Sequence, residues 1–367
     1  MNNIKNAVAL LILLVLSVKC CLAHVDDYVI REHAGGLAFP KSMTLLPDNS
    51  LLISHKHGVI TRVTSEKTQK EFSLSLPELY SEGQGGVLDL LVISGFSESH
   101  HMTSSELLIS YSKGTAEDNR LAIVSATFSF SEGITNLKPV FEVNDGKDTP
   151  VHYGGKLLKL PEGGYLVTTG DGFDYREQAQ VISSHLGKII GFTLDGQPLP
   201  SPAFEEAPYV YSLGHRNPQG LVNFNGDIYQ HEHGPDGGDE LNLIVKGNNY
   251  GWPVITKGLD YSGARISPFI QYKGMENPLV DWTPSIAPSS MAVYAHTAFA
   301  SLENTLLVSS LKAQHLFAVY EAANGWKAVP IIDQLETRLR DVKVDASGNI
   351  WVLTDGENAK IFKISPS

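Results

Sequence analysis

The chain has 367 residues, of which 42% are apolar and 19% are charged, and its formal net charge at pH 7 is −12. Such an acidic chain is a poor candidate for binding nucleic acid or an anionic membrane surface, but it is compatible with bound cations. Its length and apolar content are sufficient for a large hydrophobic core.

The first 23 residues have the form of a secretory signal peptide. Lys5 precedes an apolar run over residues 7–18, which is too short to span a bilayer. Small residues close the run, so we expect cleavage after Ala23, export of the protein and no stable membrane insertion.

The two cysteines of the chain, Cys20 and Cys21, both lie in this segment. The mature chain therefore has no thiol, which excludes disulfide bonds and thiolate-bound metals. A lipid anchor at these cysteines is the alternative to cleavage, but Lys19 disrupts the lipoprotein pattern. Removal of the segment, with Lys5 and Lys19, changes the net charge to about −14.

One hairpin-like pattern recurs six times along the mature chain. Each copy is an apolar stretch, a turn, and a second apolar stretch that usually ends in a polar residue. The turns fall near Asn49, Ser104, Gly163, Gly226, Asn304 and Gly348, and the strands that follow cover residues 51–54, 107–110, 165–168, 228–231, 306–309 and 350–353. The mean spacing of about 60 residues is that of one propeller blade with some loop decoration.

These repeats predict an all-β fold, a six-bladed β-propeller with four-stranded antiparallel blades, as a single domain over residues 24–367. The 33 glycines, the 19 prolines and the lack of a long helical periodicity agree with this. An array of β-sandwiches is the alternative. In a propeller, the polar residues that end the six repeat strands should converge on one face. They are residues 54–56, 110–111, 168–171, 231–233, 309–312 and 354–355.

Residues 214–220 and 233–242 form the densest polar signal. The second segment combines carboxylates with Gly and Pro, and such irregular backbone offers the hard oxygen ligands that calcium prefers. A solvated acidic turn is the alternative, because the spacing does not match an EF-hand loop. His231 and His233 would point to the same side of a strand, which raises zinc as a further alternative, but no third ligand follows at a useful spacing.

Three cations form a second candidate cluster. Arg338 and Arg340 lie on one face of a predicted strand, and Lys312 ends another repeat strand. Such a cluster in an acidic chain must be neutralised, and arginine binds carboxylates bidentately. Pairing of the arginines with Glu336 and Asp341 is the alternative to binding a ligand.

His152 follows a turn-rich stretch, residues 145–148. It is a candidate general base, although a single histidine in this context is more often structural.

Taken in chain order, these pieces resemble the soluble PQQ-dependent glucose and aldose sugar dehydrogenases, the glucose/sorbosone dehydrogenase family. Any one piece is weak, but nine of them occur in the family's order through nearly the whole mature chain. They are residues 82–86, 152–157, 186–188, 214–220, 232–242, 249–253, 287–290, 306–312 and 338–342.

The resemblance implies a propeller that holds pyrroloquinoline quinone (PQQ), a flat tricarboxylate, on its central face. Lys312, Arg338 and Arg340 would grip the quinone, and Gln84, Arg216 and Asn217 would complete the polar shell. The carbonyl groups of Gly234 and Pro235 resemble the ligands of a calcium ion that touches the quinone. Glu240 and the carbonyl of Tyr250 look like a second, structural calcium site.

The mechanism that the resemblance implies is oxidation of an aldose at its C1 hydroxyl to the lactone. His152 would take the hydroxyl proton while hydride leaves C1 for the quinone, and calcium and Arg216 would stabilise the charge that arrives on the quinone oxygen. Electrons would then pass to an external acceptor, which is a quinone, a dye or a cytochrome. A periplasmic monomer is expected.

The sequence departs from the glucose-oxidising members at two positions. The acidic residue that precedes the catalytic histidine in those members is Val151 here, and the aromatic residue that covers the sugar is displaced, because Trp282 lies one step early and Thr283 takes its place. A broad, weak aldose site is therefore expected.

Two other functions fit parts of the pattern. A calcium-dependent lactonase-like hydrolase would use the carboxylates and histidines, but it gives no reason for Lys312, Arg338 and Arg340. A non-catalytic propeller that binds glycans or proteins would tolerate the loss of His152 and Arg216, and both are present.

Overall fold

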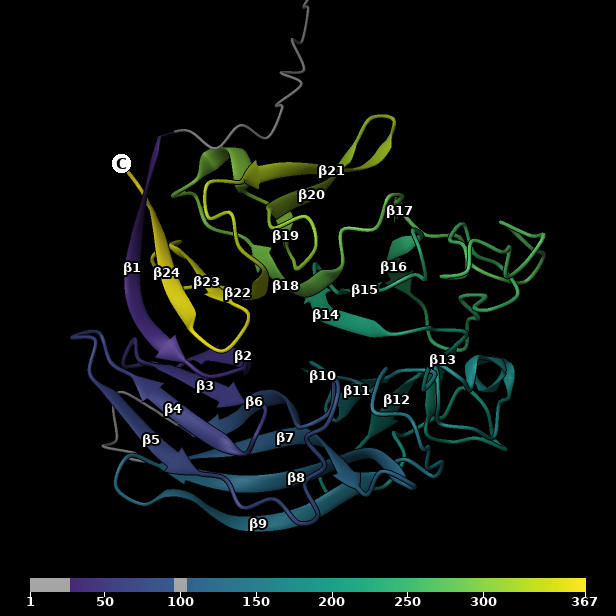
Figure 1. Ribbon diagram of the computed structural model, residues 1–367, viewed down its shortest axis with the longest axis horizontal. Coiled ribbons are helices and arrows are strands. Elements are labelled where there is room, and N and C mark those ends of the chain that lie inside the picture. The colour runs from purple at the N-terminus through teal and green to yellow at the C-terminus, as the bar shows by residue number, and fades with distance from the viewer. Residues whose placement is uncertain (1–26, 96–103) are drawn as a thin grey trace, which may run out of the picture.

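The six turns expected from the sequence fall between the first and second strands of six separate β-sheets. The computed structural model describes residues 27–95 and 104–367, so the predicted signal peptide, residues 1–23, lies outside the described residues. The sheets are four-stranded and antiparallel. They surround a common centre as the blades of a six-bladed propeller (Figure 1), which confirms the predicted fold class.

The first three blades follow one another along the chain. The first contains β2 (Pro40–Leu45), β3 (Leu51–His55), β4 (Val59–Val63) and β5 (Gln69–Ser73). The second contains β6 (Val87–Gly95), β7 (Ser104–Gly114), β8 (Asn119–Ser129) and β9 (Gly133–Glu142). The third contains β10 (Gly154–Lys159), β11 (Tyr165–Thr169), β12 (Lys188–Phe192) and β13 (Val210–Leu213).

The fourth and fifth blades repeat this arrangement. The fourth contains β14 (Pro218–Phe224), β15 (Asp227–Glu232), β16 (Asp239–Ile244) and β17 (Val280–Trp282). The fifth contains β18 (Pro288–Tyr294), β19 (Thr305–Ser310), β20 (Leu316–Ala322) and β21 (Gly325–Ile332). In the part of the chain that the structure describes, helix is limited to two 3-10 segments, η1 (Arg176–Gln180) and η2 (Ala300–Leu302).

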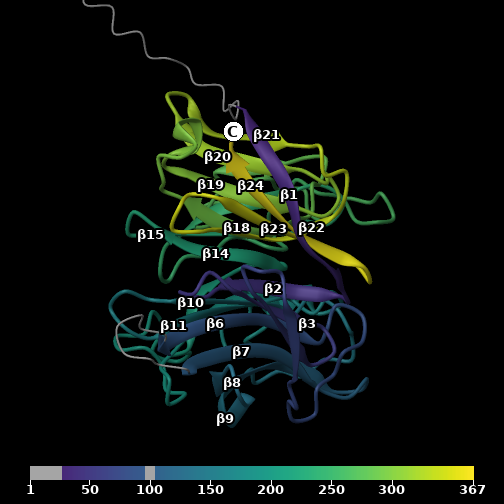
Figure 2. The same ribbon diagram turned by 90° about the vertical axis from the view of Figure 1, so that its left-hand side faces the viewer.

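The sixth blade closes the ring by joining the two ends of the described chain. It contains β22 (Leu339–Val344), β23 (Ile350–Thr354) and β24 (Ala359–Pro366), and its outer strand is β1 (Tyr28–Leu37). Figure 2 shows β1 running alongside β24. Closure in this way completes the last blade with the first strand and so pairs strands from opposite ends of the described chain.

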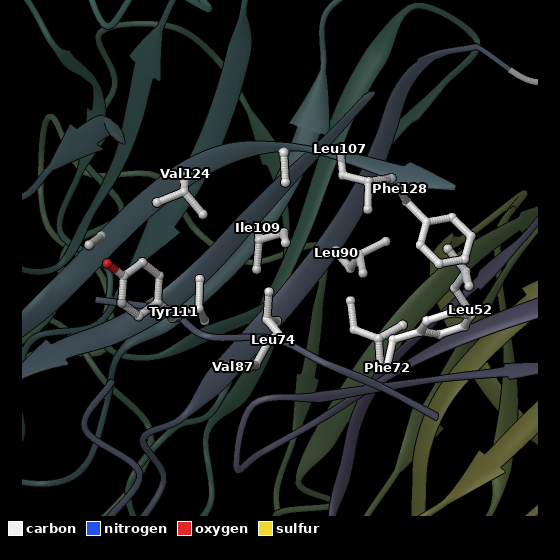
Figure 3. Packing of buried hydrophobic residues seen from close by; sticks show 14 of the residues in the cluster. Leu52, Phe72, Leu74, Val87, Leu90, Leu107, Ile109, Tyr111, Val124 and Phe128 are labelled. Carbon is white, nitrogen blue, oxygen red and sulfur yellow. The ribbon is translucent and has the colours of Figure 1, made fainter. Parts of the chain in front are cut away.

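The core lies between neighbouring blades, because each sheet buries both faces against the next. Figure 3 shows one such layer, where Leu52 and Phe72 of the first blade pack on Leu107, Ile109 and Phe128 of the second. The rings of Phe72 and Phe128 meet edge to face with centroids 5.3 Å apart, a favourable aromatic geometry. The strand sequences therefore read as nearly continuous apolar runs rather than as alternating ones.

Buried carboxylates connect the inner strands of adjacent blades. Asp341 of β22 accepts a hydrogen bond from the backbone N–H of Met43 in β2, at 2.7 Å. Asp89 of β6 accepts one from the backbone N–H of Leu157 in β10, at 3.0 Å. Each bond satisfies a buried donor across a blade boundary, so these acidic residues stabilise the ring.

Candidate active site

Every inner strand carries a β-bulge near its first residue. The register shifts lie between Pro40 and Ser42, Val87 and Asp89, Gly154 and Leu157, Pro218 and Gly220, Pro288 and Ser290, and Leu339 and Asp341. Each bulge contributes a residue to one central cavity, and these residues are Lys41, Leu88, Lys156, Gln219, Ser289 and Arg340. A bulge leaves an extra residue outside the strand ladder and re-aims its side chain, and the six bulges together build the cavity wall.

The cavity is strongly cationic. Lys41, Lys156, Arg338 and Arg340 line it, and its lining includes no carboxylate from the described residues. The two arginines share Asp355, which does not line the cavity. Its carboxylate accepts hydrogen bonds of 2.9 Å from Arg338 Nε and 2.8 Å from Arg340 Nη2. Although burial alone would raise it, the arginines hold the pKa of Asp355 below its usual range. The arginines therefore pair with Asp355. The alternative, in which they pair with Glu336 and Asp341, is wrong.

Lys41 is a cavity residue that the sequence did not reveal. Its Nζ donates to the backbone carbonyl of Gln84 at 3.0 Å, an uncharged partner. Burial, and then the charges of Arg340 and Lys56, lower the pKa of Lys41 to about 7. Cations held this close together are costly in the free protein, and a bound anion would stabilise their charged forms.

His152 immediately precedes Tyr153 and Gly154 of the cavity lining, and its side chain contacts Asp171. Its Nδ1 is 2.7 Å from Asp171 Oδ1, and both side chains are almost completely buried. Burial lowers the pKa of His152, and the hydrogen bond to Asp171 opposes this only in part. A carboxylate oxygen accepts the bond, so the hydrogen of the neutral imidazole belongs on Nδ1, and Nε2 keeps a lone pair that can take a proton.

Asp171 organises the surroundings of the histidine as well as its ring. Its Oδ1 also accepts the backbone N–H of Phe173 at 2.8 Å, and its Oδ2 accepts Nε1–H of Trp252 at 2.7 Å. The backbone N–H of His152 donates to Gln84 Oε1 at 2.9 Å, and Gln84 lines the cavity. His152 has a φ of +54°, a strained value for a non-glycine residue that is characteristic of functional sites.

Arg216 and Asn217, two of the residues expected to bind the cofactor, are both buried. The Arg216 guanidinium donates to the carbonyl of Gly234 at 2.5 Å and lies over the ring of Trp252. Asn217 lines the cavity and accepts a hydrogen bond from Gln219 at 3.1 Å.

Lys312 is not part of the cavity lining. It is the second residue after β19, it is exposed, and its neighbour Leu311 is the one that reaches the cavity. No ion pair or side-chain hydrogen bond joins Lys312 to any other described residue, so its charge is not neutralised by one of them.

The candidate calcium residues fall into two groups. Gly234 and Pro235 follow β15 close to Arg216, and the carbonyl of Gly234 is engaged by that arginine. Glu240 and Tyr250 line a small neighbouring pocket. Within residues 27–95 and 104–367, no group of three or more His, Cys, Asp or Glu side chains is arranged so that it could hold a metal ion by itself.

Glu232 is a further acidic residue of that pocket. It lies directly opposite Glu240 in the pairing of β15 with β16. Burial, and then the charge of Glu232, raise the pKa of Glu240 well above its usual value. Two carboxylates placed face to face are unfavourable unless a proton or a cation lies between them, so the pocket suits a hard cation.

Several sequence expectations can be located in the fold. The polar segments that end the repeat strands lie beside the bulged ends of the inner strands. Of the residues in these segments, only His233 and Leu311 line the cavity. His231 is fully buried, and burial lowers its pKa to about 3. Trp282 is buried in an apolar cluster between the fourth and fifth blades, so it cannot cover a sugar.

No helix in the described part of the chain is long and apolar enough to cross a membrane.

Fold and site together define a class: a six-bladed propeller with a cation-lined central cavity and a buried His–Asp pair that is hydrogen-bonded to the cavity wall through Gln84. The family model described as Glucose / Sorbosone dehydrogenase matches residues 37–363. Aldose sugar dehydrogenase YliI of Escherichia coli (strain K12) is 30% identical over an alignment of 346 positions, which covers 90% of this chain and 91% of that protein.

Two further relatives carry names that bear on the cofactor. Quinoprotein glucose dehydrogenase B of Acinetobacter calcoaceticus is 27% identical and covers 86% of this chain and 83% of its own length. The PQQ-bound form of an aldose sugar dehydrogenase from Streptomyces coelicolor has a TM-score of 0.73, 25% identity, and coverage of 92% of this chain and 98% of that one. The chain therefore belongs to the glucose/sorbosone dehydrogenase family, whose named relatives are sugar oxidoreductases.

Proposed function

We propose that the chain is a PQQ- and calcium-dependent dehydrogenase that oxidises the C1 hydroxyl of aldose sugars to lactones. The observation that carries the proposal is the position of the His152–Asp171 pair, joined through Gln84 to a cavity whose charged lining residues are all cations. A proton acceptor beside a polyanion site is the combination that this reaction requires.

The cavity suits PQQ because the quinone carries three carboxylates. Arg338 and Arg340 would bind them, Lys41 would add a third cation, and Lys312 would close the mouth. Gln84 and Asn217 add uncharged polar groups to the cavity wall, and Arg216 precedes Asn217 in the chain. Charge-assisted bonds of this type are strong in a partly buried site.

Calcium suits the groups beside the cavity. The carbonyl groups of Gly234 and Pro235 would hold the ion next to the quinone, and the bond from Arg216 to Gly234 would be exchanged for it. Glu240, with the carbonyl of Tyr250 and the facing Glu232, would hold a second ion, which removes the repulsion between the two carboxylates. Oxygen ligands of this mixture are typical of calcium.

When bound, the quinone supplies the two-electron acceptor for the hydride that leaves C1, and calcium supplies a Lewis acid. The chain's own residues handle the proton. Nε2 of His152 takes it from the C1 hydroxyl as the C1–O double bond forms, and Asp171 holds the ring in the required tautomer and stabilises the imidazolium. Arg216 places a fixed positive charge beside the reacting groups.

The expected substrate range depends on Val151, the residue that precedes His152. Val151 offers no hydrogen bond to a sugar hydroxyl, so we expect broad and weak recognition of aldoses. The electrons leave to an external acceptor, and the proposed setting is the periplasm of an exported protein.

Dye-linked oxidation of a panel of aldoses by the purified apo-protein, with and without PQQ and calcium, tests the proposal. We expect activity only when both are added. The variant His152→Ala should still bind PQQ but oxidise sugar several orders of magnitude more slowly. Absence of both sugar oxidation and PQQ binding would contradict the proposal and favour a non-catalytic binding propeller.

A further inference from the structure

Lys147 is a buried lysine that does not line the cationic cavity. Only 3% of its surface is exposed. Its Nζ donates to Asn119 Oδ1 at 3.2 Å and to the backbone carbonyl of Thr149, and both of these partners are uncharged. The same amine lies 3.6 Å from the centroid of the Tyr153 ring, which is a cation–π contact. Because lysine is almost never fully buried unless it is paired with a carboxylate, this position has a considerable cost in free energy.

Lys147 joins the segment that carries His152 to the segment that carries Asp171. Its bond to the Thr149 carbonyl fixes the start of the turn that leads to His152. The Thr149 hydroxyl in turn donates to the carbonyl of Gly172 at 2.6 Å, and Gly172 directly follows Asp171. A Cβ atom added to Gly172 would lie only 2.8 Å from Cδ of Lys147. The stem of the lysine therefore packs against one segment while its amine binds the other.

A further set of bonds connects Lys147 to the cavity wall. Its backbone N–H and carbonyl pair with the backbone of Asn119, the first residue of β8, at 3.0 and 2.9 Å. The hydroxyl of Tyr153, which lines the cavity, donates to the Asn119 oxygen that also accepts the lysine amine. A displacement of Lys147 would therefore reach both Thr149 and Tyr153, which lie on either side of His152 in the chain.

The charge of Lys147 also acts on the imidazole. Burial is the main influence that lowers the pKa of His152; Asp171 raises it, and the charges of Arg216 and Lys147 lower it further. His233 is the other titratable neighbour, and burial lowers its pKa to about 4, so it is uncharged near neutral pH. Burial lowers the pKa of Lys147 itself to about 7, although Asp171 opposes the effect. Lys147 is therefore charged in the pH range in which His152 titrates.

We infer that Lys147 is a positioning residue of the proposed reaction, which holds the segments of His152 and Asp171 in place and keeps the imidazole unprotonated before the sugar binds. This inference rests on the proposed function. Since Lys147 does not line the cavity, it acts through His152 rather than on the sugar or the quinone. A general base must be free of its proton when the substrate arrives, and a fixed cation nearby favours that state.

An NMR titration of the apo-protein tests the effect of the charge without quinone or sugar. Histidine labelled with carbon-13 at Cε1 reports each imidazole, and the signal of His152 is assigned by its loss in His152→Ala. Lys147→Met keeps a stem of similar length but removes the charge. The midpoint of the His152 titration should therefore move to higher pH in this variant.

Lys188→Met is the matched control for this titration. Lys188 is also a fully buried lysine, and its amine is held by three backbone carbonyl groups, those of Gln178, Ala179 and Leu186. It is not among the charges that influence His152, so its loss should leave the midpoint where it is in the wild type. An unmoved midpoint in Lys147→Met, or the same movement in Lys188→Met, would overturn the inference.

Turnover of the holoenzyme, reconstituted with PQQ and calcium, tests the connection between the two segments. Lys147→Met should lower kcat for glucose by about 10-fold or more, because a misplaced base is costly, and Lys188→Met should change it by less than about 2-fold. Thr149→Val removes the bond to Gly172 but keeps the ammonium group, and it remains informative if Lys147→Met does not fold. It should lower kcat by about 3- to 10-fold without moving the His152 midpoint; normal turnover in Thr149→Val would contradict the connection.

The two measurements separate this inference from the proposed function. A His152 midpoint that moves in Lys147→Met, in a protein that oxidises no aldose, would support the action of Lys147 on the imidazole and contradict the proposed function alone. Aldose oxidation that is as fast in Lys147→Met as in the wild type, with an unmoved midpoint, would leave the proposed function standing and refute the role of Lys147.

Discussion

Asp171 and His152 form a buried pair in which one carboxylate oxygen lies 2.7 Å from the imidazole Nδ1. The two residues come from segments that flank the β10–β11 hairpin, 19 positions apart in the chain. The pair determines which nitrogen of His152 remains able to accept a proton.

Replacement of this carboxylate tests its role as a positioning residue. Asp171→Asn should lower kcat by roughly 100-fold or more, because the amide no longer stabilises the imidazolium or enforces the tautomer. PQQ affinity, measured by titration of the apo-protein, should change little. Retention of normal turnover would contradict the assigned role.

The pH dependence supplies an independent readout for the same pair. Burial lowers the pKa of His152 while Asp171 raises it, so in the wild type kcat/KM should rise with pH through a value below the ordinary 6.5. Asp171→Asn removes the carboxylate that raises the pKa of His152. The rise of kcat/KM with pH should therefore occur at lower pH in this variant. Profiles of kcat/KM between pH 4 and 8 check the direction.

Lys41 should contribute to cofactor binding in a pH-dependent way. Its pKa is about 7 in the ligand-free protein because of burial and the nearby Arg340 and Lys56, although Asp355 opposes the effect. An anion in the cavity favours the charged amine, so binding should take up a proton above pH 7, and PQQ affinity should fall as the pH rises. Calorimetry in buffers of different ionisation enthalpy measures that uptake.

The matched variants for this prediction are Lys41→Met and Lys56→Met. Loss of Lys41 should weaken PQQ binding by about 10-fold and abolish the proton uptake. Lys56 donates to the carbonyl of Gly83 and does not line the cavity, so its loss should have a smaller effect. An identical response of the two variants would show that only general charge matters.

The facing glutamates predict opposite effects of one substitution with and without metal. Glu240→Gln removes the repulsion from Glu232, so without calcium the variant should unfold at the same temperature as the wild type or higher. With calcium the wild type should gain thermal stability and the variant should gain much less. Thermal unfolding in chelator and in millimolar calcium compares the two; equal calcium gains would argue against an ion at this pocket.

Asp341 should be important for the stability of the ring. It is fully buried and bonds Met43 of the next blade, Ser290 of the previous blade and Lys343. Asp341→Ala leaves these donors unpaired and should cost about 3–5 kcal/mol of the free energy of unfolding. Lys360→Ala, which removes an exposed partner of Glu32, should cost less than about 1 kcal/mol in the same denaturant titration.

The local pattern of the sequence was sufficient to predict the propeller. Each repeat places an apolar strand, a turn and a second apolar strand in order, and because these contacts are short-range, the six turns near Asn49, Ser104, Gly163, Gly226, Asn304 and Gly348 could be recognised without the fold. The order of polar segments also indicated the family, including Asn217, which lines the cavity, and the buried residues His152 and Arg216.

The contacts that build the site were decided by the tertiary structure. The inner-strand bulges that bring Lys41 into the cavity depend on strand pairing, which no short sequence window reveals. Asp355 was recognised only as a polar strand end, yet it is the partner of both arginines, and Asp171 becomes the partner of His152 only when β10 and β11 pair. The meeting of Phe173 with Tyr261 requires two connections 88 residues apart to fold toward each other. Chemistry carried by single residue types can be read along the chain, but distances between side chains are set when the blades close into a ring.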